Sequence, residues 1–345
     1  MTPILRSGLA ITAAWLLVVG SRGNVTRTLV AAPRAQAQSS GAGPAGDLEV
    51  LQLRPNFFMI AGAGGNIGVQ IGDDGVVVVD SGSASNVDAV VTAIKKVSSQ
   101  PIRYVINTGP DGDHVGGNAS VSRAGQTLFT GGGGPGIAPS FIGGAASILS
   151  HEKVLARVSA ASAAGAGLPG AGWPTETFHQ LRKYMYLNGE GIEVLHQPAA
   201  HSDGDAMVFF RRSDIVVAGD VLDTTRFPVI DVERGGTIDG EIAALNRLAD
   251  LAIPSVPIVS REEGTLVIAG HGRVCDQLDV VEYRDMVTIV RDRVRDLIRG
   301  GASLEQVKAA APTRGYTRRY GSDTGAWTTS AFVEAVYRSL SKAKS

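Results

Sequence analysis

The sequence predicts a layered α/β fold followed by a helical tail. Short apolar segments separated by glycine-rich turns alternate with segments of helical spacing, and this alternation occurs in two rounds. Beyond residue 276 the apolar residues recur only at intervals of three and four, which is typical of amphipathic helices. With 345 residues, 44% of them hydrophobic and 19% charged, the chain has enough apolar material to bury a core.

The first round of strands and helices runs from residue 49 to residue 158. Strands are predicted at 49–53, 57–61, 67–71, 76–79 and 102–106, and helices at 87–97 and 148–158. The four valines of 76–79 indicate a buried strand that ends at Asp80. The segment 107–117 is predicted to be a loop, and the seven glycines of 131–144 predict a flexible one.

The second round begins after an Ala/Gly-rich stretch, 160–172, that we predict to be irregular. Strands are predicted at 183–187, 192–195, 206–210, 215–218 and 266–268, with a helix at 238–251. The tail starts with a helix over 276–299, which Gly300 and Gly301 end. Ser303 and Gln306 have the spacing of a capping box for the next helix. Phe332, Val336 and Leu340 predict a terminal helix.

The first 46 residues differ in composition from the rest and predict export. Arg6 precedes an apolar run, 8–20, that has the length of a signal-peptide core, and Ala35-Gln36-Ala37 offers a cleavage site. We therefore interpret 1–46 as a signal peptide and linker of a periplasmic or secreted protein that has no stable membrane insertion after processing. An uncleaved anchor or a misassigned start codon is the alternative. The remaining chain divides into a domain over 47–275 and a helical extension over 276–345.

Charge and cysteine content exclude several classes of protein. Thirty-two basic and 33 acidic residues give a net charge of −1, which does not support binding to nucleic acid and agrees with a small-molecule substrate. The single cysteine, Cys275, excludes an intramolecular disulfide and a cysteine-rich zinc module.

Four polar clusters follow predicted strands, where loops carry chemistry. They lie at 107–118, 200–205, 218–220 and 270–272. Each contains a carboxylate or an imidazole, and both are ligands for zinc, iron or manganese. The glycines beside them allow the backbone to turn tightly around an ion. Together the clusters predict a metal site.

These clusters carry a family resemblance. In order, they read DHVGGN, HSDGD, GD and GHG, and from about residue 49 to residue 276 the chain resembles the metallo-β-lactamase superfamily. The resemblance implies a four-layered αββα sandwich, to which this chain adds its C-terminal helical extension. It also implies that the glycine-rich hairpin at 62–66 lies over the active site.

The resemblance further implies a set of metal ligands, with one departure. The family's first motif, H-x-H-x-D-H, reads Gly109-Pro110-Asp111-Gly112-Asp113-His114 here. The ligand positions of one of the family's two metal sites are all present in this sequence. They are Asp113, His114, His271 and the bridging Asp220. The other keeps His201 and Asp220, with Asp111 in place of one histidine and Gly109 in place of the second.

The function that follows is metal-dependent hydrolysis of a small-molecule ester, amide or thioester by an activated water, with Asp113 taking part in catalysis. We expect one or two divalent ions, zinc first and iron or manganese as alternatives. A catalytically impaired member that binds only a metal or ligand is the alternative function. An oxidoreductase with an iron pair is a third, and it needs a flavin-domain partner.

The apolar stripes of the tail are expected to pack on the sandwich or against a second subunit, as in a homodimer.

Overall fold

The computed structural model of the protein describes residues 48–128, 144–165, 167–255 and 264–342. All of them belong to one compact unit. The predicted signal peptide and linker, and all of the predicted glycine-rich loop except Gly144, lie outside the described residues. None of the described helices is long and apolar enough to cross a membrane.

Within the described residues, the strands form two sheets. The first has the order β1-β2-β3-β4-β5-β6-β7, with β1 (Glu49–Arg54), β2 (Phe57–Ala63), β3 (Gly65–Gly72), β4 (Gly75–Val79), β5 (Ile102–Ile106), β6 (Ser147–His151) and β7 (Glu176–Phe178). The second has the order β13-β12-β11-β10-β9-β8, with β8 (Arg182–Leu187), β9 (Glu190–Gln197), β10 (Asp205–Phe210), β11 (Ile215–Asp223), β12 (Leu266–His271) and β13 (Val274–Cys275). Pairing is parallel from β4 to β7 and between β11 and β12.

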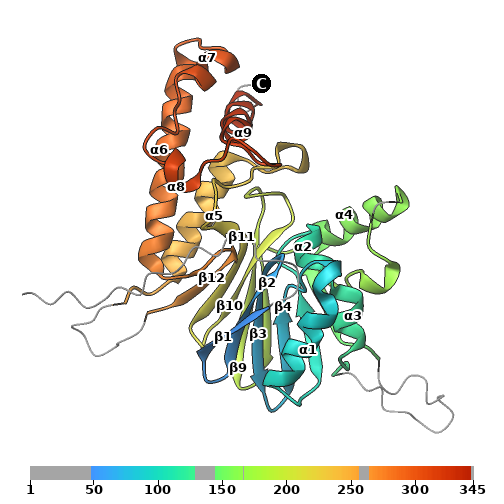
Figure 1. Cartoon of the computed structure of the whole chain (residues 1–345). Coiled ribbons are helices and arrows are strands. Elements are labelled where there is room, and N and C mark those ends of the chain that lie inside the picture. The colour runs from blue at the N-terminus through green and yellow to red at the C-terminus, as the bar shows by residue number, and fades with distance from the viewer. Residues whose placement is uncertain (1–47, 129–143, 166, 256–263, 343–345) are drawn as a thin grey trace, which may run out of the picture. The chain divides into compact units, whose positions relative to one another are not determined.

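The two sheets pack face to face, with helices on their outer faces (Figure 1). Side chains from both sheets, among them Phe57, Val77, Phe210 and Val217, share one buried cluster. The outer face of the first sheet packs on α1 (Val87–Val97) and α3 (Asn118–Arg123). The outer face of the second packs on α5 (Ile238–Leu251) and the helices of the tail. This is the predicted αββα arrangement.

The helical extension follows β13. It contains α6 (Gln277–Arg299), α7 (Leu304–Ala309), α8 (Thr317–Tyr320) and α9 (Thr329–Lys342). The predicted capping box is present, since the Ser303 side chain accepts from the Gln306 N–H and Gln306 Oε1 accepts from the Ser303 N–H. The apolar stripe of α6 is buried against the domain, with Val280, Tyr283 and Val290 in the same cluster as α5.

One predicted helix was wrong. The segment 148–158 is not a single helix, because 147–151 is strand β6 and only Glu152–Ala163 is helix α4. Ile148 and Leu149 are buried in a parallel strand between β5 and β7. The ring of His151 accepts the Lys153 N–H and so begins the helix there. The alanines that predicted irregular structure extend α4 to residue 163, which agrees with their high helix propensity.

Candidate metal centre

The predicted ligands come from loops and strand ends that the two sheets bring together. Asp111 is the N-cap residue of the short helix α2 (Gly112–Val115), which carries Asp113 and His114 inside the segment predicted as a loop. His201 lies between β9 and β10, and His271 ends β12. Two groups of ligand atoms result, each with its atoms within 4.8 Å of one another: Asp113, His114 and His271, and Asp111, His201 and Asp220.

Asp220 links the two groups. Its carboxylate lies 3.2 Å from His114 Nε2 and 3.4 Å from His271 Nε2, and 4.0 Å from His201 Nε2. Gly219 before it has a φ of 55°, and a Cβ there would lie 2.5 Å from Thr108 Oγ1. Glycine is therefore required at this irregular point of β11, where the register shifts and Asp220 reaches the centre. We call Asp113, His114, Asp220 and His271 the His114 group, and Asp111, His201 and Asp220 the His201 group.

His114 is held in one orientation by Asp80. The ring is fully buried, and Nδ1 lies 2.8 Å from Asp80 Oδ2. Because an ionised carboxylate only accepts hydrogen bonds, Nδ1 is the donor and Nε2 is the atom that faces the centre. Asp80 is fixed in turn by the Thr108 N–H at 2.8 Å and the Thr108 hydroxyl at 2.6 Å. The sequence predicts that Asp80 caps a turn or supports a ligand rather than binding the metal itself, and this contact places it behind the ring of His114.

The Nε2 atom of His114 has no hydrogen-bond partner among the described residues. Its close contact is an ion pair with the Asp220 carboxylate at 3.2 Å, which does not have hydrogen-bonding geometry. A buried polar atom without a hydrogen bond is rare in a site that binds no ligand. A divalent ion between Nε2 and Asp220 would satisfy both groups, so the residues of the His114 group fit a metal.

The donors of the His114 group stabilise one another's charged forms. Burial lowers the pKa of His271, but hydrogen bonds to Asp113 and Asp220 raise it to about 9. Burial likewise opposes the charge on His114, yet Asp220 and Asp80 raise its pKa well above the usual value. Burial raises the pKa of Asp113, but contacts with His271 and His114 leave it below its usual value. An ion bound here would compete with protons for the imidazoles, so its binding is expected to strengthen as the pH rises.

The His201 group is organised differently, by ion pairs within the protein. His201 Nε2 lies 2.8 Å from Asp111 Oδ2, and His201 Nδ1 donates to the Val229 carbonyl at 2.8 Å. The guanidinium of Arg234 donates to Asp111 Oδ1 at 2.6 Å. Burial raises the pKa of Asp111, but the hydrogen bonds from His201 and Arg234 hold it at about 2. Both oxygens of Asp111 thus already have partners.

The glycine-rich hairpin between β2 and β3 lies against the His114 group, where the resemblance placed it. A Cβ on Gly64, whose φ is 110°, would lie 3.0 Å from Asp113 Cβ, and one on Gly65 would lie 3.6 Å from His114 Cε1. Asn66 fixes the hairpin by donating to the carbonyls of Ala269 and Gly272 at 2.8 and 3.0 Å.

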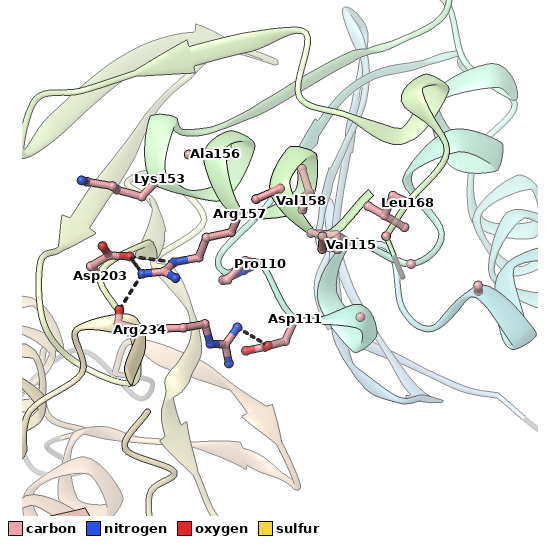
Figure 2. Close-up of a pocket in the computed structure, with 16 residues that line it drawn as sticks. Pro110, Asp111, Val115, Lys153, Ala156, Arg157, Val158, Leu168, Asp203 and Arg234 are labelled. Atoms are coloured by element: carbon pink, nitrogen blue, oxygen red, sulfur yellow. Dashed lines mark hydrogen bonds and ion pairs between the residues drawn. The ribbon is translucent and has the colours of Figure 1, made fainter. Parts of the chain in front are cut away.

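A cavity of about 760 Å³ opens beside the His201 group (Figure 2). Asp111 and Arg234 line it together with Arg157, Lys153 and Asp203. Figure 2 shows these charged side chains on one side of the cavity, and the apolar Val115, Val158 and Leu168 on the other. The volume is in the range of small-molecule sites.

The family is decided by sequence comparison. A model of the metallo-beta-lactamase superfamily matches residues 62–271, which is more than half of the chain. The chain belongs to this superfamily. No curated protein matches it significantly.

Solved structures share the superfamily fold with this chain. A metallo-beta-lactamase from Pontibacter korlensis has 17% identity and a TM-score of 0.51, and the match covers 70% of this chain and 99% of that one. The sec-alkylsulfatase Pisa1 from Pseudomonas sp. has 14% identity and a TM-score of 0.58, with 84% of this chain and 50% of that one covered. This chain therefore spans about half the length of the alkylsulfatase. At these identities the likeness shows the fold alone.

Within the superfamily frame, the structure places all six predicted ligands at one centre. Sequence reasoning missed Arg234, which the short helix Val232–Arg234 brings to Asp111, and Asp231, which caps that helix and pairs with Arg234. The only local signal was the pair of opposite charges three residues apart, and such pairs are common on surfaces.

Asp80 gives a first testable prediction. Asp80→Asn keeps the side-chain shape and weakens the acceptor for His114 Nδ1–H, so we expect zinc affinity to fall about 10- to 100-fold. Competition with a fluorescent chelator measures the change. Asp214→Asn is the matched control, because Asp214 is also buried with a positive φ of 56° but bonds Thr265, away from the centre. Equal affinities of both variants and the wild type would contradict the role of Asp80.

Proposed function

We propose that this chain is a metal-dependent hydrolase that acts on a small-molecule ester, amide or thioester and uses one divalent ion in the His114 group. The observation that carries the proposal is the buried Nε2 of His114, which has no hydrogen-bond partner among the described residues and faces Asp220. Nδ1 is committed to Asp80, so Nε2 is available only to the centre. Membership of the superfamily supports the same chemistry.

The donor set favours zinc. Two imidazoles and two carboxylates suit Zn²⁺, whereas manganese prefers sites richer in oxygen; iron also accepts two imidazoles with a carboxylate and is the metal to be distinguished from zinc. Elemental analysis of protein purified without added metal tests this. We expect about one zinc per chain, activity that is lost with a chelator, and activity that returns with zinc. Metal-free protein that hydrolyses the same substrates at the same rate would overturn the proposal.

When bound, a divalent ion supplies Lewis-acid chemistry and lowers the pKa of a coordinated water. The residues of the chain do the rest. Asp113 is partly exposed, with 31% of its side chain accessible, and its lowered pKa keeps it ionised at neutral pH. Its carboxylate can accept a hydrogen bond from the attacking water and then its proton. The hairpin at Gly64 and Gly65 restricts solvent access from one side.

We further propose that the substrate carries a negative charge and occupies the cavity of Figure 2. Three basic and two acidic side chains line it, and the ammonium of Lys153 has no ion-pair partner among the described residues. The wall of Val115, Val158 and Leu168 suits an apolar portion of the substrate. The likeness to a sec-alkylsulfatase adds an alkyl sulfate to the substrate panel, beside esters, thioesters and lactams.

Lys153 provides the test of that substrate class. We expect Lys153→Ala to raise KM for an anionic substrate by up to about fivefold, since an exposed charge contributes about 1 kcal/mol at most. The kcat should be unchanged, and so should KM for a neutral ester of the same size. Lys95→Ala is the matched control, because Lys95 is an exposed lysine on α1. An equal KM change for both substrates would contradict an electrostatic role.

The alternative function is a binding protein that keeps the fold and a metal but has lost turnover. It is favoured by the His201 group, in which Asp111 bonds His201 and Arg234 within the protein. Stoichiometric zinc with no turnover on the whole substrate panel would select this alternative.

We also propose that the protein is exported and processed near Gln38. Arg6, the apolar run 8–20 and Ala35-Gln36-Ala37 support the proposal. N-terminal sequencing of protein recovered from its native host should start near residue 38. Intact Met1 on protein from the cytoplasmic fraction would contradict export.

A further inference from the structure

The His201 group has the atoms of a metal site but also holds a cation of the protein's own. Arg234 Nη1 lies 2.6 Å from Asp111 Oδ1, and Arg234 Nη2 lies 3.5 Å from His201 Nε2. The remaining Asp111 oxygen is 2.8 Å from the same His201 nitrogen. Two of the three ligands that a second metal ion needs are therefore engaged with the guanidinium or with each other.

The position of Arg234 is fixed from several directions. Its Nε donates to Asp231 Oδ2 at 2.5 Å, and its backbone N–H donates to Asp231 Oδ1 at 2.9 Å. Its carbonyl accepts from the Asp203 N–H at 2.9 Å and from Arg157 Nη2 at 2.8 Å. Gly235 follows in the left-handed region, with a φ of 87°, and ends the turn. Arg234 is thus built into the site, unlike a mobile surface side chain.

The charge of Arg234 is also permanent. A guanidinium stays protonated throughout the working range of a protein, so it opposes the charge of Asp111 wherever that carboxylate is ionised. Its planar shape matches a carboxylate, and a carboxylate stands at Asp111 where the superfamily motif has a histidine. A divalent ion placed within a few ångströms of this charge would be repelled. The residues of the His201 group therefore do not fit a metal in the presence of Arg234.

We propose that Arg234 takes the place of the second metal ion of this centre, so that the protein binds one divalent ion, in the His114 group. In the superfamily motif a histidine at position 111 would bind the second metal ion, whereas here Asp111 binds Arg234. The inference rests on the proposed function, since it presumes that the His114 group is loaded. It adds that the positive charge beside the substrate cavity belongs to the protein and persists when the single ion is removed.

The test is the number of zinc ions per chain, measured by native mass spectrometry and elemental analysis after equilibration with zinc and gel filtration. We expect one ion in the wild type and two in Arg234→Met, which keeps the apolar stem but frees Asp111 and His201. Lys153→Met is the matched control, because Lys153 is a charged residue of the same cavity and forms no ion pair with Asp111 or hydrogen bond with His201 or Arg234 among the described residues. It should keep one ion.

A second variant tests whether the His201 group binds an ion, even if Arg234→Met fails to fold. His201→Ala should keep one zinc, because His201 holds no ion in the wild type. Zinc lost from His201→Ala, two ions in the wild type, or one ion in a folded Arg234→Met would each overturn the role of Arg234 and leave the metal-dependent function intact. No ion in the wild type would overturn both the inference and the proposed function.

Discussion

His271→Ala is expected to purify with little or no metal and to lose hydrolytic activity with it. His271 supplies one of four donors in the His114 group, and its Nε2 lies 3.2 Å from Asp113 and 3.4 Å from Asp220. Alanine leaves two carboxylates and one imidazole around the ion. Loss of a direct ligand should cost more than loss of an outer partner, so we expect zinc affinity to fall by more than about 100-fold.

The control for this variant is His179→Ala, which removes an exposed imidazole that bonds Gln180. Its zinc content and affinity should equal those of the wild type. Circular dichroism and thermal unfolding of both variants establish that the metal-free protein is folded. Full zinc occupancy in His271→Ala would show that the ion is bound elsewhere.

The position of this centre was predictable because its residues follow strands that the hydrophobic pattern reveals. The four valines of β4 and the apolar run of β5 end at Asp80 and Asn107, and both strands are buried and parallel. The carboxyl ends of parallel strands lie at the same edge of a sheet, so polar residues after them meet there. The local sequence was enough for most of the strands, though not for β6, β7 and β13, and the motif order was enough for the fold family.

The features that were predicted wrongly or missed depend on contacts between residues that are far apart in the sequence. The segment of β6 and α4 has helical spacing, but Ile148 and Leu149 pair with β5 and β7, and tertiary pairing overrides local propensity. Arg234 meets Asp111 across 123 residues of sequence. No periodicity or motif marks such an arginine, because its role is created only when the loop after β11 folds against α2.

Removal of the helical extension is expected to prevent folding of the domain. The six largely buried side chains of α6 are Val280, Tyr283, Met286, Val287, Val290 and Val294, and they share a cluster with α5 and the outer face of the second sheet. Burial of such side chains contributes about 1.5–3 kcal/mol each, so the six together contribute about 9–18 kcal/mol. The conformational entropy lost when the tail becomes ordered offsets part of this gain, but the net stability of a typical domain is only about 5–15 kcal/mol.

The buried stripe of α6 also distinguishes the two predicted ways of covering the tail, which were packing on the sandwich and packing against a second subunit. It packs within the same chain, so a second subunit is not needed to bury it, and the homodimer stays a prediction. Phe332 of α9 adds a stacked contact with Phe227, whose ring centroid lies 4.7 Å away. Phe227 lies just beyond β11, the strand that carries Asp220, so the tail supports the segment next to the metal centre.

A chain truncated after Cys275 should therefore be insoluble or aggregated, and should not be a soluble, inactive domain. Loss of the tail exposes the apolar face of α5, including Leu245 and Leu248, which are fully buried in the intact chain. A chain truncated after Lys342 retains every described helix and is the control, which should be soluble and bind zinc. Solubility, analytical gel filtration and zinc content compare the two. A truncated 1–275 chain that is monomeric, unfolds cooperatively and holds zinc would show that the domain folds without its extension.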